Sequence, residues 1–389
     1  MRIALIAPFA YAPKATVSAR MMPIATALAR RGHVVHVLIP PYDNPSDSGR
    51  RWQQDGVAIE NMRLRRLPFS LAQFADLARQ IVRSVQALNP EVVHVFKPVG
   101  VGALGLFGLR QAAVVDNDDW EGRGGWVDVN PYPRLLRWFM LWQERWALRR
   151  AAAVTCASTA LVERSRTLGG ASKPVLLFPN GPRETLRAQV ARAEQQRQAL
   201  RQRFGWGDEW VLIYAGTVPV NHDLDVAVQA LAGLRDKPWR WAIIATGDGL
   251  PSLRRQIARA GLDRRVEWHG FMPHAQLVER LVAADIALYP YRDTLINRAK
   301  CSGKVIDYMA CGKPMVVSNL GMNQVYLDGG RCGMLTPPGD AAAFRQALLQ
   351  LMDNPALAHA LGQAAQAHVW QAFGWEGRIQ ALIELYQQL

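Results

Sequence analysis

Apolar, β-branched runs alternate with helical patterns twice along this chain, and no other feature constrains the fold as much. Uninterrupted apolar runs of this kind are typical of strands that are buried on both faces of a parallel sheet. Strands that alternate with helices pair in parallel, and the helices cover both faces. The sequence therefore predicts an α/β protein with two doubly wound sheets, whose loops at the carboxyl strand ends meet at one interdomain cleft.

The predicted strands fall into two sets, one in each half of the chain. In the first half they are Arg2–Ala7, Val34–Ile39, Val92–Phe96, Ala113–Val115, Ala153–Cys156 and Val175–Phe178. In the second half they are Trp210–Tyr214, Trp241–Ala245, Arg265–Trp268, Ile286–Tyr289 and Met315–Val317. A helix is expected at Ser18–Arg31, and a helical stretch at 184–203 separates the sets. Because Pro-Asn-Gly-Pro at 179–182 is a strong turn signal, we place the domain boundary there, between residues 1–182 and 183–372.

Length and charge bound the kind of protein this can be. With 389 residues, of which 50% are hydrophobic, each of two domains can bury an ample core. The formal net charge of +14 attracts anions such as nucleotide phosphates, anionic lipid head groups or nucleic acid. Because the basic residues are dispersed and no nucleic-acid-binding module is recognised, nucleic acid is not an expected partner.

The cysteines and the apolar segments favour a cytoplasmic protein. Cys156, Cys301, Cys311 and Cys332 lack zinc-type spacing, so we expect reduced thiols and no metal cluster. The longest uncharged segment, Val99–Leu109, has about half the length that a membrane-spanning helix needs. We therefore expect no transmembrane helix.

The stretch Asn297–Asn319 combines clustered positive charge, a small-residue turn and a helix start. Ser302 and Gly303 are suited to end a loop and cap a helix, so backbone N–H groups near Lys304 would point at an anion, aided by the helix dipole. The alternative is a solvated basic loop before an ordinary helix. We favour the anion site, because such sites at helix N-termini are common and a turn and a strand follow.

Charged side chains complete the predicted socket for a nucleotide diphosphate. Arg298, Lys300 and Lys304 supply mobile positive charge for phosphate. Asp307 follows Lys304 by three residues on the same helical face, where a carboxylate can accept ribose hydroxyls. These four residues are the predicted core of a donor site.

Short motifs in a fixed order make the chain resemble glycosyltransferases of the GT-B fold, specifically family 4, nearly from end to end. The motifs are A-L-A-R-R-G-H-V-V-H-V after the first helix, F-P-N-G at 178–181, Y-A-G-T at 214–217, A-T-G-D-G-L at 245–250, V-E-W-H-G-F-M-P-H at 266–274, A-A-D-I-A-L-Y-P at 283–290, K-V-I-D-Y-M-A-C-G-K-P from Lys304, and F-G-W-E-G-R near the end. The resemblance implies two Rossmann-like domains, with the C-terminal helix, about 373–389, returning to the N-terminal, acceptor-side domain.

The resemblance also implies a hexosyltransferase. Such an enzyme moves a sugar from a nucleotide-sugar to a hydroxyl of a glycan, lipid-linked or small-molecule acceptor, with retention of configuration and without metal or other cofactor. Lys304 matches the family's lysine near the donor phosphates, and Asp307 stands where the family has a ribose-binding glutamate. The implied nucleotide and cleft loops carry Gly216, Gly247, Gly249, Gly270 and Phe271.

Two positions of the donor half depart from the family pattern. Ala299 stands where members have a second glutamate that contacts the sugar, so that contact is lost. His222 stands where many members have a phosphate-binding lysine. A phosphate hydrogen bond from His222 and a helix-capping role are equally good interpretations, and Arg298 and Lys300 are candidates to compensate.

The first half carries an acidic loop, D-N-D-D-W-E-G-R-G-G-W at 116–126, where the family places a histidine or acidic cluster near the reacting carbon. Asp118 and Asp119 are the predicted catalytic carboxylates, which orient the acceptor hydroxyl or take its proton. Neighbouring carboxylates need solvent, loop amides or cations such as Arg123. A metal is discounted, since it would belong beside the donor phosphates; a loop-capping cluster is the alternative.

Two further places in the first half offer side chains to the predicted cleft. His94 and Lys97 lie at the end of a strand, and His94 is equally well explained as a packed core histidine. The first loop lacks the Gly-Gly pair of many members. Its side chains Lys14, Thr16 and Arg20 would contact acceptor or phosphate, whereas Ser18 is expected to cap a helix.

The segment Tyr132–Arg150 sets aromatic side chains on one helical face with arginines around it. The face comprises Leu135, Trp138, Phe139, Trp142 and Trp146. A basic, Trp-rich amphipathic helix can lie in a membrane interface. We favour packing onto the sheet as core, since a segment here is ordinarily internal. An anionic membrane surface, with the protein peripheral on its inner face, stays the alternative.

Two other functions compete with sugar transfer. A nucleotide-sugar 2-epimerase shares the GT-B fold, but the order of the motifs fits family 4 better. A catalytically silent nucleotide-sugar-binding or membrane scaffold is suggested by Ala299 and His222. Measurable turnover would separate sugar transfer and epimerisation, which are both catalytic, from the silent scaffold.

Overall fold

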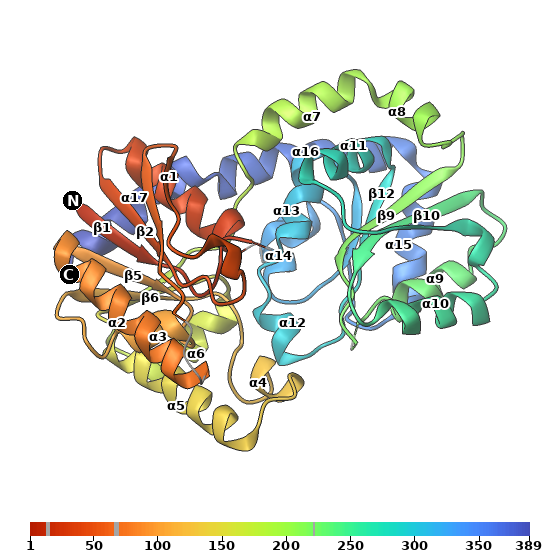
Figure 1. Cartoon of the computed structure of the whole chain (residues 1–389). Helices are drawn as coiled ribbons and strands as arrows, with labels where there is room; N and C mark the ends of the chain where they lie inside the picture. The colour runs from red at the N-terminus through yellow and green to blue at the C-terminus, as the bar shows by residue number, and fades with distance from the viewer. Residues whose placement is uncertain (13–15, 66–69, 221) are drawn as a thin grey trace. The chain divides into compact units, whose positions relative to one another are not determined.

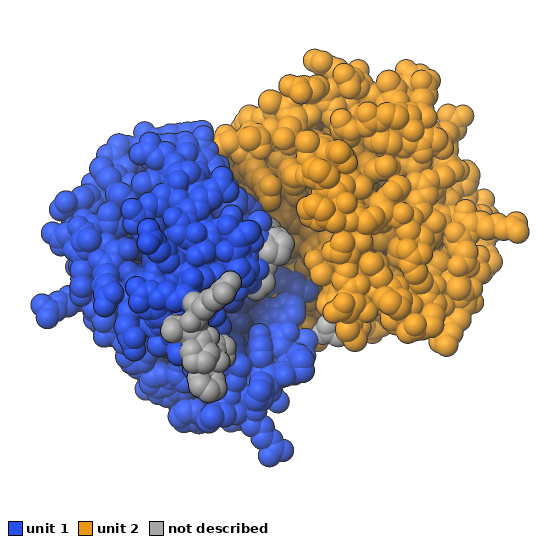
Figure 2. Space-filling view, viewed as in Figure 1, with its two compact units in different colours: residues 1–180, 299–301, 375–389 blue, residues 181–298, 302–374 orange. Residues whose placement is uncertain are grey.

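The computed structural model describes residues 1–12, 16–65, 70–220 and 222–389, and the chain divides into two compact units. Unit 1 comprises Met1–Asn180, Ala299–Cys301 and Trp375–Leu389, and unit 2 comprises Gly181–Arg298 and Ser302–Gly374 (Figure 2). Each unit has its own sheet with helices on both faces, and the pairing is parallel except at one edge strand of unit 1 (Figure 1). The prediction of two Rossmann-like α/β domains is confirmed.

Unit 1 contains an eight-stranded sheet in the order β3-β4-β2-β1-β5-β6-β7-β8. The strands are β1 Arg2–Ile6, β2 Val34–Ile39, β3 Arg51–Gln54, β4 Val57–Asn61, β5 Val92–Phe96, β6 Ala112–Asn117, β7 Ala153–Cys156 and β8 Val175–Leu177. All neighbours pair in parallel except β3 and β4, a polar edge hairpin that the sequence did not predict. The order reverses between β1 and β5, so the carboxyl ends of these two strands form the switch point at which ligands of such sheets bind.

The helices of unit 1 cover both faces of this sheet. They are α1 Met22–Arg30, α2 Ser70–Leu88, α3 Val101–Gly105, α4 Trp126–Val129, α5 Arg134–Arg150, α6 Thr159–Gly169 and α17 Trp375–Gln387. The last helix, α17, packs on α1 and buries Trp375 against Phe178, with ring centroids 5.9 Å apart. The end of the chain thus contributes to the core of unit 1.

The first helix differs from the prediction of one helix over Ser18–Arg31. A π-helical turn, Val17–Met21, precedes α1, which has Pro23 as its second residue. Proline lacks the N–H that would continue the ladder to the preceding turn, so the hydrogen-bond register changes there. Thr16 holds the N-cap position and Ser18 lies inside the turn, so the expected capping by Ser18 is wrong.

Unit 2 contains a six-stranded, all-parallel sheet in the order β11-β10-β9-β12-β13-β14. The strands are β9 Trp210–Thr217, β10 Trp239–Thr246, β11 Val266–His269, β12 Ile286–Tyr289, β13 Met315–Ser318 and β14 Met334–Thr336. The helices are α7 Thr185–Gln195, α8 Arg197–Arg203, α9 Asp225–Ala232, α10 Leu250–Arg259, α11 His274–Ala283, α12 Leu295–Ala299, α13 Gly303–Ala310, α14 Met322–Tyr326, α15 Ala341–Asp353 and α16 Pro355–Phe373. The switch point lies between β9 and β12.

Helix α5 overturns the expectation that its aromatic face is core. The face carries exposed side chains, with Leu135 at 78% and Trp138 at 63% exposure. The buried face instead holds Gln143 and Glu144. Gln143 exchanges two hydrogen bonds with the Gly100 backbone and Glu144 binds Arg164, so polar partners make this side the inner one. No helix among the described residues is long and apolar enough to cross a membrane.

Candidate functional site

Lys304 lies at the switch point of unit 2, in the first turn of α13. Its ammonium lies over the ring of Tyr289, the last residue of β12, with 5.6 Å from Nζ to the ring centroid. Gly216, at the end of β9, lies beneath the same side chain, because a Cβ added there would be 1.6 Å from Lys304 Cε. Gly216 has a φ of 148°, which a side chain would also resist. Two predicted donor residues far apart in sequence therefore meet.

The predicted helix N-terminus at Lys304 exists, although its cap differs from the prediction. Ser302 is the N-cap residue of α13, but its side chain makes no capping bond. The Ser302 hydroxyl instead donates to the Tyr289 hydroxyl, at 2.9 Å. The first N–H groups of α13 are thus not covered by this side chain, which suits a helix end that binds an anion.

The glycine loops after β9 and β10 lie against each other. The N–H of Gly249 donates to Val218 O at 2.9 Å, and the N–H of Val218 donates to Thr246 O at 2.8 Å. A Cβ on Gly247 would be 2.4 Å from Val218 O, and one on Gly249 would be 2.1 Å from Pro219 O. Glycine at both positions lets these backbones approach, so the two loops pack into one continuous backbone surface next to Gly216.

Asp307 faces a partner that the sequence did not single out. His274 Nε2 lies 3.3 Å from the Asp307 Oδ2, and both side chains are about one-fifth exposed. His274 begins α11 and is the last residue of V-E-W-H-G-F-M-P-H, so the motif itself carried the signal. In the same loop a Cβ added to Gly270 would meet no atom within 4 Å, and Phe271 is 86% exposed, so this loop is open to solvent.

The other predicted phosphate ligands have different surroundings. Arg298 binds Asp293 through two hydrogen bonds, of 2.5 and 2.8 Å, so its guanidinium already has an anion. Lys300 is half-buried and belongs to unit 1. His222 precedes α9, whose N-cap is Leu224, so His222 does not cap this helix. Its Nδ1 is buried without a hydrogen-bond partner among the described residues, and burial lowers its pKa. The phosphate-ligand interpretation stays a prediction.

Lys97 forms ion pairs with three carboxylates of the acidic loop at the switch point of unit 1. It follows β5, and its Nζ lies 2.9 Å from Asp118 Oδ1, 2.7 Å from Asp119 Oδ2 and 2.8 Å from Glu121 Oε1. The residue has a φ of 70°, which is uncommon outside glycine. Lys97, rather than Arg123, is thus the cation that makes neighbouring carboxylates tolerable, and Glu121 joins the predicted pair. We call these four residues the acidic cluster.

Burial separates the two predicted catalytic carboxylates. Burial raises the pKa of Asp118 to about 7, an effect that the Lys97 charge opposes and the Asp119 charge supports. Asp119 is more open, with 34% of its side chain exposed against 9% for Asp118. Burial alone would lower the pKa of Lys97, but the three carboxylates hold it well above its ordinary value. Asp118 can therefore accept or donate a proton near neutral pH.

In the wild type, the Asp118 carboxyl is expected to lower the free energy of unfolding as the pH rises, and Asp118→Asn is expected to remove this pH dependence. Between the unfolded pKa of about 3.9 and the folded value of about 7, the folded carboxyl keeps a proton that the unfolded chain has lost. The free energy of unfolding therefore falls as pH rises, by up to about 1.4 kcal/mol per unit from this group. Urea unfolding across this interval should show a flatter slope for the variant. Exposed Asp236→Asn is the control; equal slopes for wild type and Asp118→Asn would contradict the prediction.

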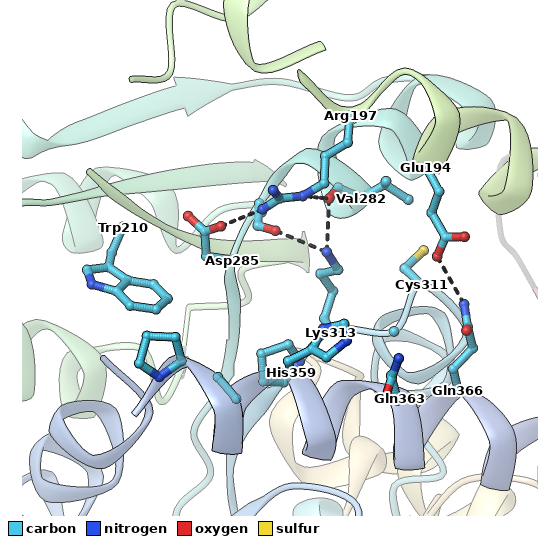
Figure 3. Close-up of a pocket in the computed structure, with 15 residues that line it drawn as sticks. Glu194, Arg197, Trp210, Val282, Asp285, Cys311, Lys313, His359, Gln363 and Gln366 are labelled. Carbon is cyan, nitrogen blue, oxygen red and sulfur yellow. Dashed lines mark hydrogen bonds and ion pairs between the residues drawn. The ribbon is translucent and has the colours of Figure 1, made fainter. Parts of the chain in front are cut away.

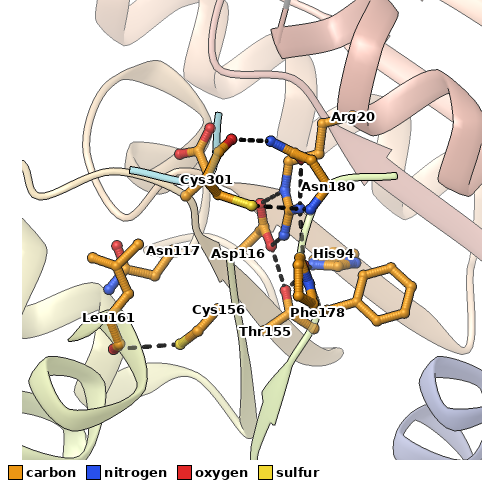
Figure 4. Close-up of polar contacts among 12 residues, drawn as sticks. Arg20, His94, Asp116, Asn117, Thr155, Cys156, Leu161, Phe178, Asn180 and Cys301 are labelled. Atoms are coloured by element: carbon orange, nitrogen blue, oxygen red, sulfur yellow. Dashed lines mark hydrogen bonds and ion pairs between the residues drawn. The ribbon is translucent and has the colours of Figure 1, made fainter. Parts of the chain in front are cut away.

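Arg20 is buried and does not offer an open contact. Its Nε donates to Asp116 Oδ2 at 2.7 Å, and its Nη2 donates to Asp116 Oδ1 at 2.6 Å (Figure 4). Its Nη1 donates to Phe178 O and to Asn180 Oδ1. Burial would raise the pKa of Asp116, but Arg20 holds it below its ordinary value. The prediction that Arg20 contacts acceptor or phosphate is corrected: the side chain ties β6 to F-P-N-G.

His94 is also part of the core of unit 1. It is 0% exposed, and one ring nitrogen lies 2.7 Å from the Tyr386 hydroxyl. The other ring nitrogen lies 3.0 Å from Thr155 Oγ1 (Figure 4). Burial lowers its pKa to about 4, so the ring is neutral at physiological pH. The packed-core alternative is correct and the catalytic prediction for His94 is wrong. Of the first-loop residues, Thr16 lies at the start of the π-helical turn, and Lys14 lies outside the described residues.

A separate pocket of unit 2, of about 640 Å³, does not contain the predicted donor residues (Figure 3). Trp210, Asp285 and Pro314 line it and stand at the amino ends of β9, β12 and β13, opposite the edge where Gly216 and Lys304 meet. Its buried Lys313 donates to Val282 O and Ala284 O, and burial lowers the Lys313 pKa to about 8. These polar groups serve to hold helix and strand ends together.

Comparison with known proteins covers both units. A "Glycosyl transferase 4-like domain" model matches residues 16–181, and a "Glycosyl transferases group 1" model matches residues 209–354. A 2-deoxystreptamine glucosyltransferase of Streptomyces kanamyceticus is 30% identical over 248 residues, 59% of each chain. The match thus spans less than two thirds of this curated relative.

Two solved structures share the fold of the whole chain. Sucrose-phosphate synthase from Thermosynechococcus elongatus has a TM-score of 0.76 at 20% identity, covering 100% of this chain and 98% of that one. HepE of Anabaena, solved in complex with UDP and glucose, has a TM-score of 0.74 at 20% identity and full coverage of both chains. At this identity the likeness concerns the fold.

Proposed function

Because the chain belongs to the GT-B glycosyltransferases, we propose that it transfers a hexose from a nucleotide-diphosphate sugar to an acceptor hydroxyl. The observation that carries the proposal is the close approach of Gly216 and Lys304 in unit 2, with the Asp307–His274 pair one turn further along the same helix, α13. Lys304 and the start of α13 would bind the diphosphate, and Asp307 would accept the ribose hydroxyls. UDP, the nucleotide bound to HepE, is the first nucleotide to test.

The acidic cluster of unit 1 supplies the chemistry proposed for the acceptor. Transfer with retention breaks the bond between the anomeric carbon and the diphosphate and forms a bond to the acceptor oxygen, whose proton must leave. Asp118, with a pKa of about 7, suits acceptance of that proton, and the more open Asp119 suits orientation of the hydroxyl. We propose transfer without a metal, because Lys97 already supplies the cation among these carboxylates.

We place the protein in the cytoplasm, at the inner face of a membrane when its acceptor is lipid-linked. The four cysteines are buried, and within the described ranges none of them forms a disulfide, which suits a reducing compartment. The acceptor is a glycan, a lipid-linked sugar or a small molecule.

Thermal unfolding with UDP, GDP, ADP and dTDP, each with its common sugars, tests the proposal. A ligand that binds the folded state raises the unfolding temperature by mass action. We expect one nucleotide to stabilise the protein, its sugar to be released in the presence of an acceptor, and EDTA to leave turnover intact. Binding without turnover, together with full retention of binding by Asp118→Asn and Asp119→Asn, would support a silent nucleotide-sugar-binding protein instead.

Asp307→Asn is expected to weaken binding of UDP by roughly tenfold and binding of pyrophosphate by much less. The reason is that a carboxylate accepts both ribose hydroxyls, whereas pyrophosphate has no ribose. Titration calorimetry with both ligands measures the difference. The control is Asp353→Asn, which changes an exposed aspartate that pairs with Lys237. If Asp307→Asn lowered the affinities for UDP and for pyrophosphate equally, the ribose role would be contradicted.

A further inference from the structure

Unit 1 exposes a contiguous aromatic surface, which we call the α5 face: Phe107, Leu135, Trp138, Phe139, Trp142 and Trp146. Phe107 follows α3 and stacks on Trp146, with ring centroids 3.8 Å apart. The ring centroids of Trp142 and Trp146 are 6.0 Å apart. Phe107 is 55% and Trp142 38% exposed. Single exposed apolar residues are normal, but a connected patch of this kind marks an interaction surface.

The position of α5 in unit 1 explains why this surface is exposed among the residues of unit 1 that the structure describes. The helix packs against α6 through its other side, where Ala147 and Leu148 are buried (Figure 1). Leu135, Trp138 and Trp142 recur at intervals of three and four, so they form one outward stripe. That stripe continues at Arg145 and Arg149. Apolar and cationic side chains thus lie on the same face of α5, and a single binding partner would contact both.

The charge of the helix selects the class of partner. Residues 134–150 contain five arginines and one acidic residue, Glu144, which is buried against Arg164. Within the described parts of the chain, Arg134, Arg145 and Arg149 have no carboxylate partner. A second copy of the chain would bring arginines against arginines at a symmetric interface, which is unfavourable. An anionic surface is complementary to both the charge and the indole rings.

We propose that the α5 face docks the protein on an anionic phospholipid surface. Trp and Leu side chains would enter the boundary between head groups and acyl chains, and the arginines would bind lipid phosphates. Docking on a membrane would make a lipid-linked molecule the acceptor. This part of the proposal rests on the sugar transfer proposed above. It needs no helix that crosses the bilayer.

Flotation of the full chain with vesicles tests the aromatic part of the face. Wild type is expected to bind vesicles of equal parts phosphatidylcholine and phosphatidylglycerol, to bind less in high salt, and not to bind phosphatidylcholine alone. Trp138→Ala with Trp142→Ala should lower partitioning at least about tenfold. Val34→Ala with Val220→Ala removes two exposed apolar side chains elsewhere and should change it little.

The arginines permit a control of matched charge and spacing. Arg145→Gln with Arg149→Gln should lower partitioning about fivefold per arginine. Arg255→Gln with Arg259→Gln removes the same charge, at the same spacing, from the exposed side of α10 and should have little effect. Equal losses for the two pairs would mean that overall charge alone acts, and would overturn the proposal.

Two further outcomes would also overturn it. The first is the absence of wild-type binding to the mixed vesicles at low salt. The second is a dimer in sedimentation velocity that Trp138→Ala with Trp142→Ala converts to a monomer, without vesicle binding by either protein. Nucleotide binding measured on the same variants separates this proposal from sugar transfer, because α5 variants should retain it and Lys304→Ala should lose it while keeping vesicle binding.

Discussion

Lys304→Ala is expected to weaken nucleotide binding by roughly ten- to a hundredfold, the scale of a lost charge-assisted hydrogen bond. The ammonium lies over Tyr289 at the switch point of unit 2, beside the N-terminus of α13. Titration calorimetry with the nucleotide that stabilises the protein measures the effect. Lys237→Ala, in a surface ion pair with Asp353, is the control and should bind as wild type does.

Gly216→Ala should produce a loss of similar size without touching the charge. Its new methyl group would occupy the place of Lys304 Cε, so the flexible lysine must move away from the site. Gly207→Ala adds a methyl group where no atom lies within 4 Å and should leave binding intact. Wild-type affinity in Gly216→Ala would show that the position of the Lys304 side chain does not matter for binding.

Arg20→Ala is expected to lower the free energy of unfolding by about 3 to 5 kcal/mol, the scale for leaving one partner of a buried ion pair uncompensated. Asp116 is 0% exposed and receives both donors of the guanidinium edge. The variant also loses the bonds from Arg20 to Phe178 O and Asn180 Oδ1. Urea unfolding at neutral pH measures the change.

Two controls isolate the burial of this pair. Arg51→Ala removes an exposed partner of Glu60 and should cost under about 1 kcal/mol. Arg20→Ala combined with Asp116→Ala should cost less than the sum of the single changes, because no unpaired charge stays behind. A cost for Arg20→Ala as small as that for Arg51→Ala would contradict the structural role.

The acidic loop illustrates how far residue patterns lead. The run of carboxylates predicted that some cation must lie among them, since like charges at this spacing repel. Its identity was not readable, because Lys97 is more than twenty residues away in sequence and reaches the loop through the pairing of β5 with β6. Arg123, the neighbour in sequence, was the wrong candidate.

Buried polar residues account for the errors in the predicted site. His94 lies in β5 and Arg20 in the π-helical turn after β1, both near the switch point of unit 1, and their chemistry suits catalysis as well as it suits a core. Which applies depends on partners such as Tyr386 and Asp116, brought in from distant segments. Exposure and pairing are properties of packing, and local periodicity does not encode them.

The sequence alone determined the two doubly wound sheets, the order of most strands in the chain and the helix start at Lys304, because strand and helix periodicity, turns and small residues act over a few neighbours. The tertiary structure decided which side of α5 is buried, which cation serves the acidic loop and which predicted ligands, such as Arg298, are already paired. Those outcomes depend on contacts between residues that are distant in sequence, and the free energy of such contacts exists only once the chain has folded.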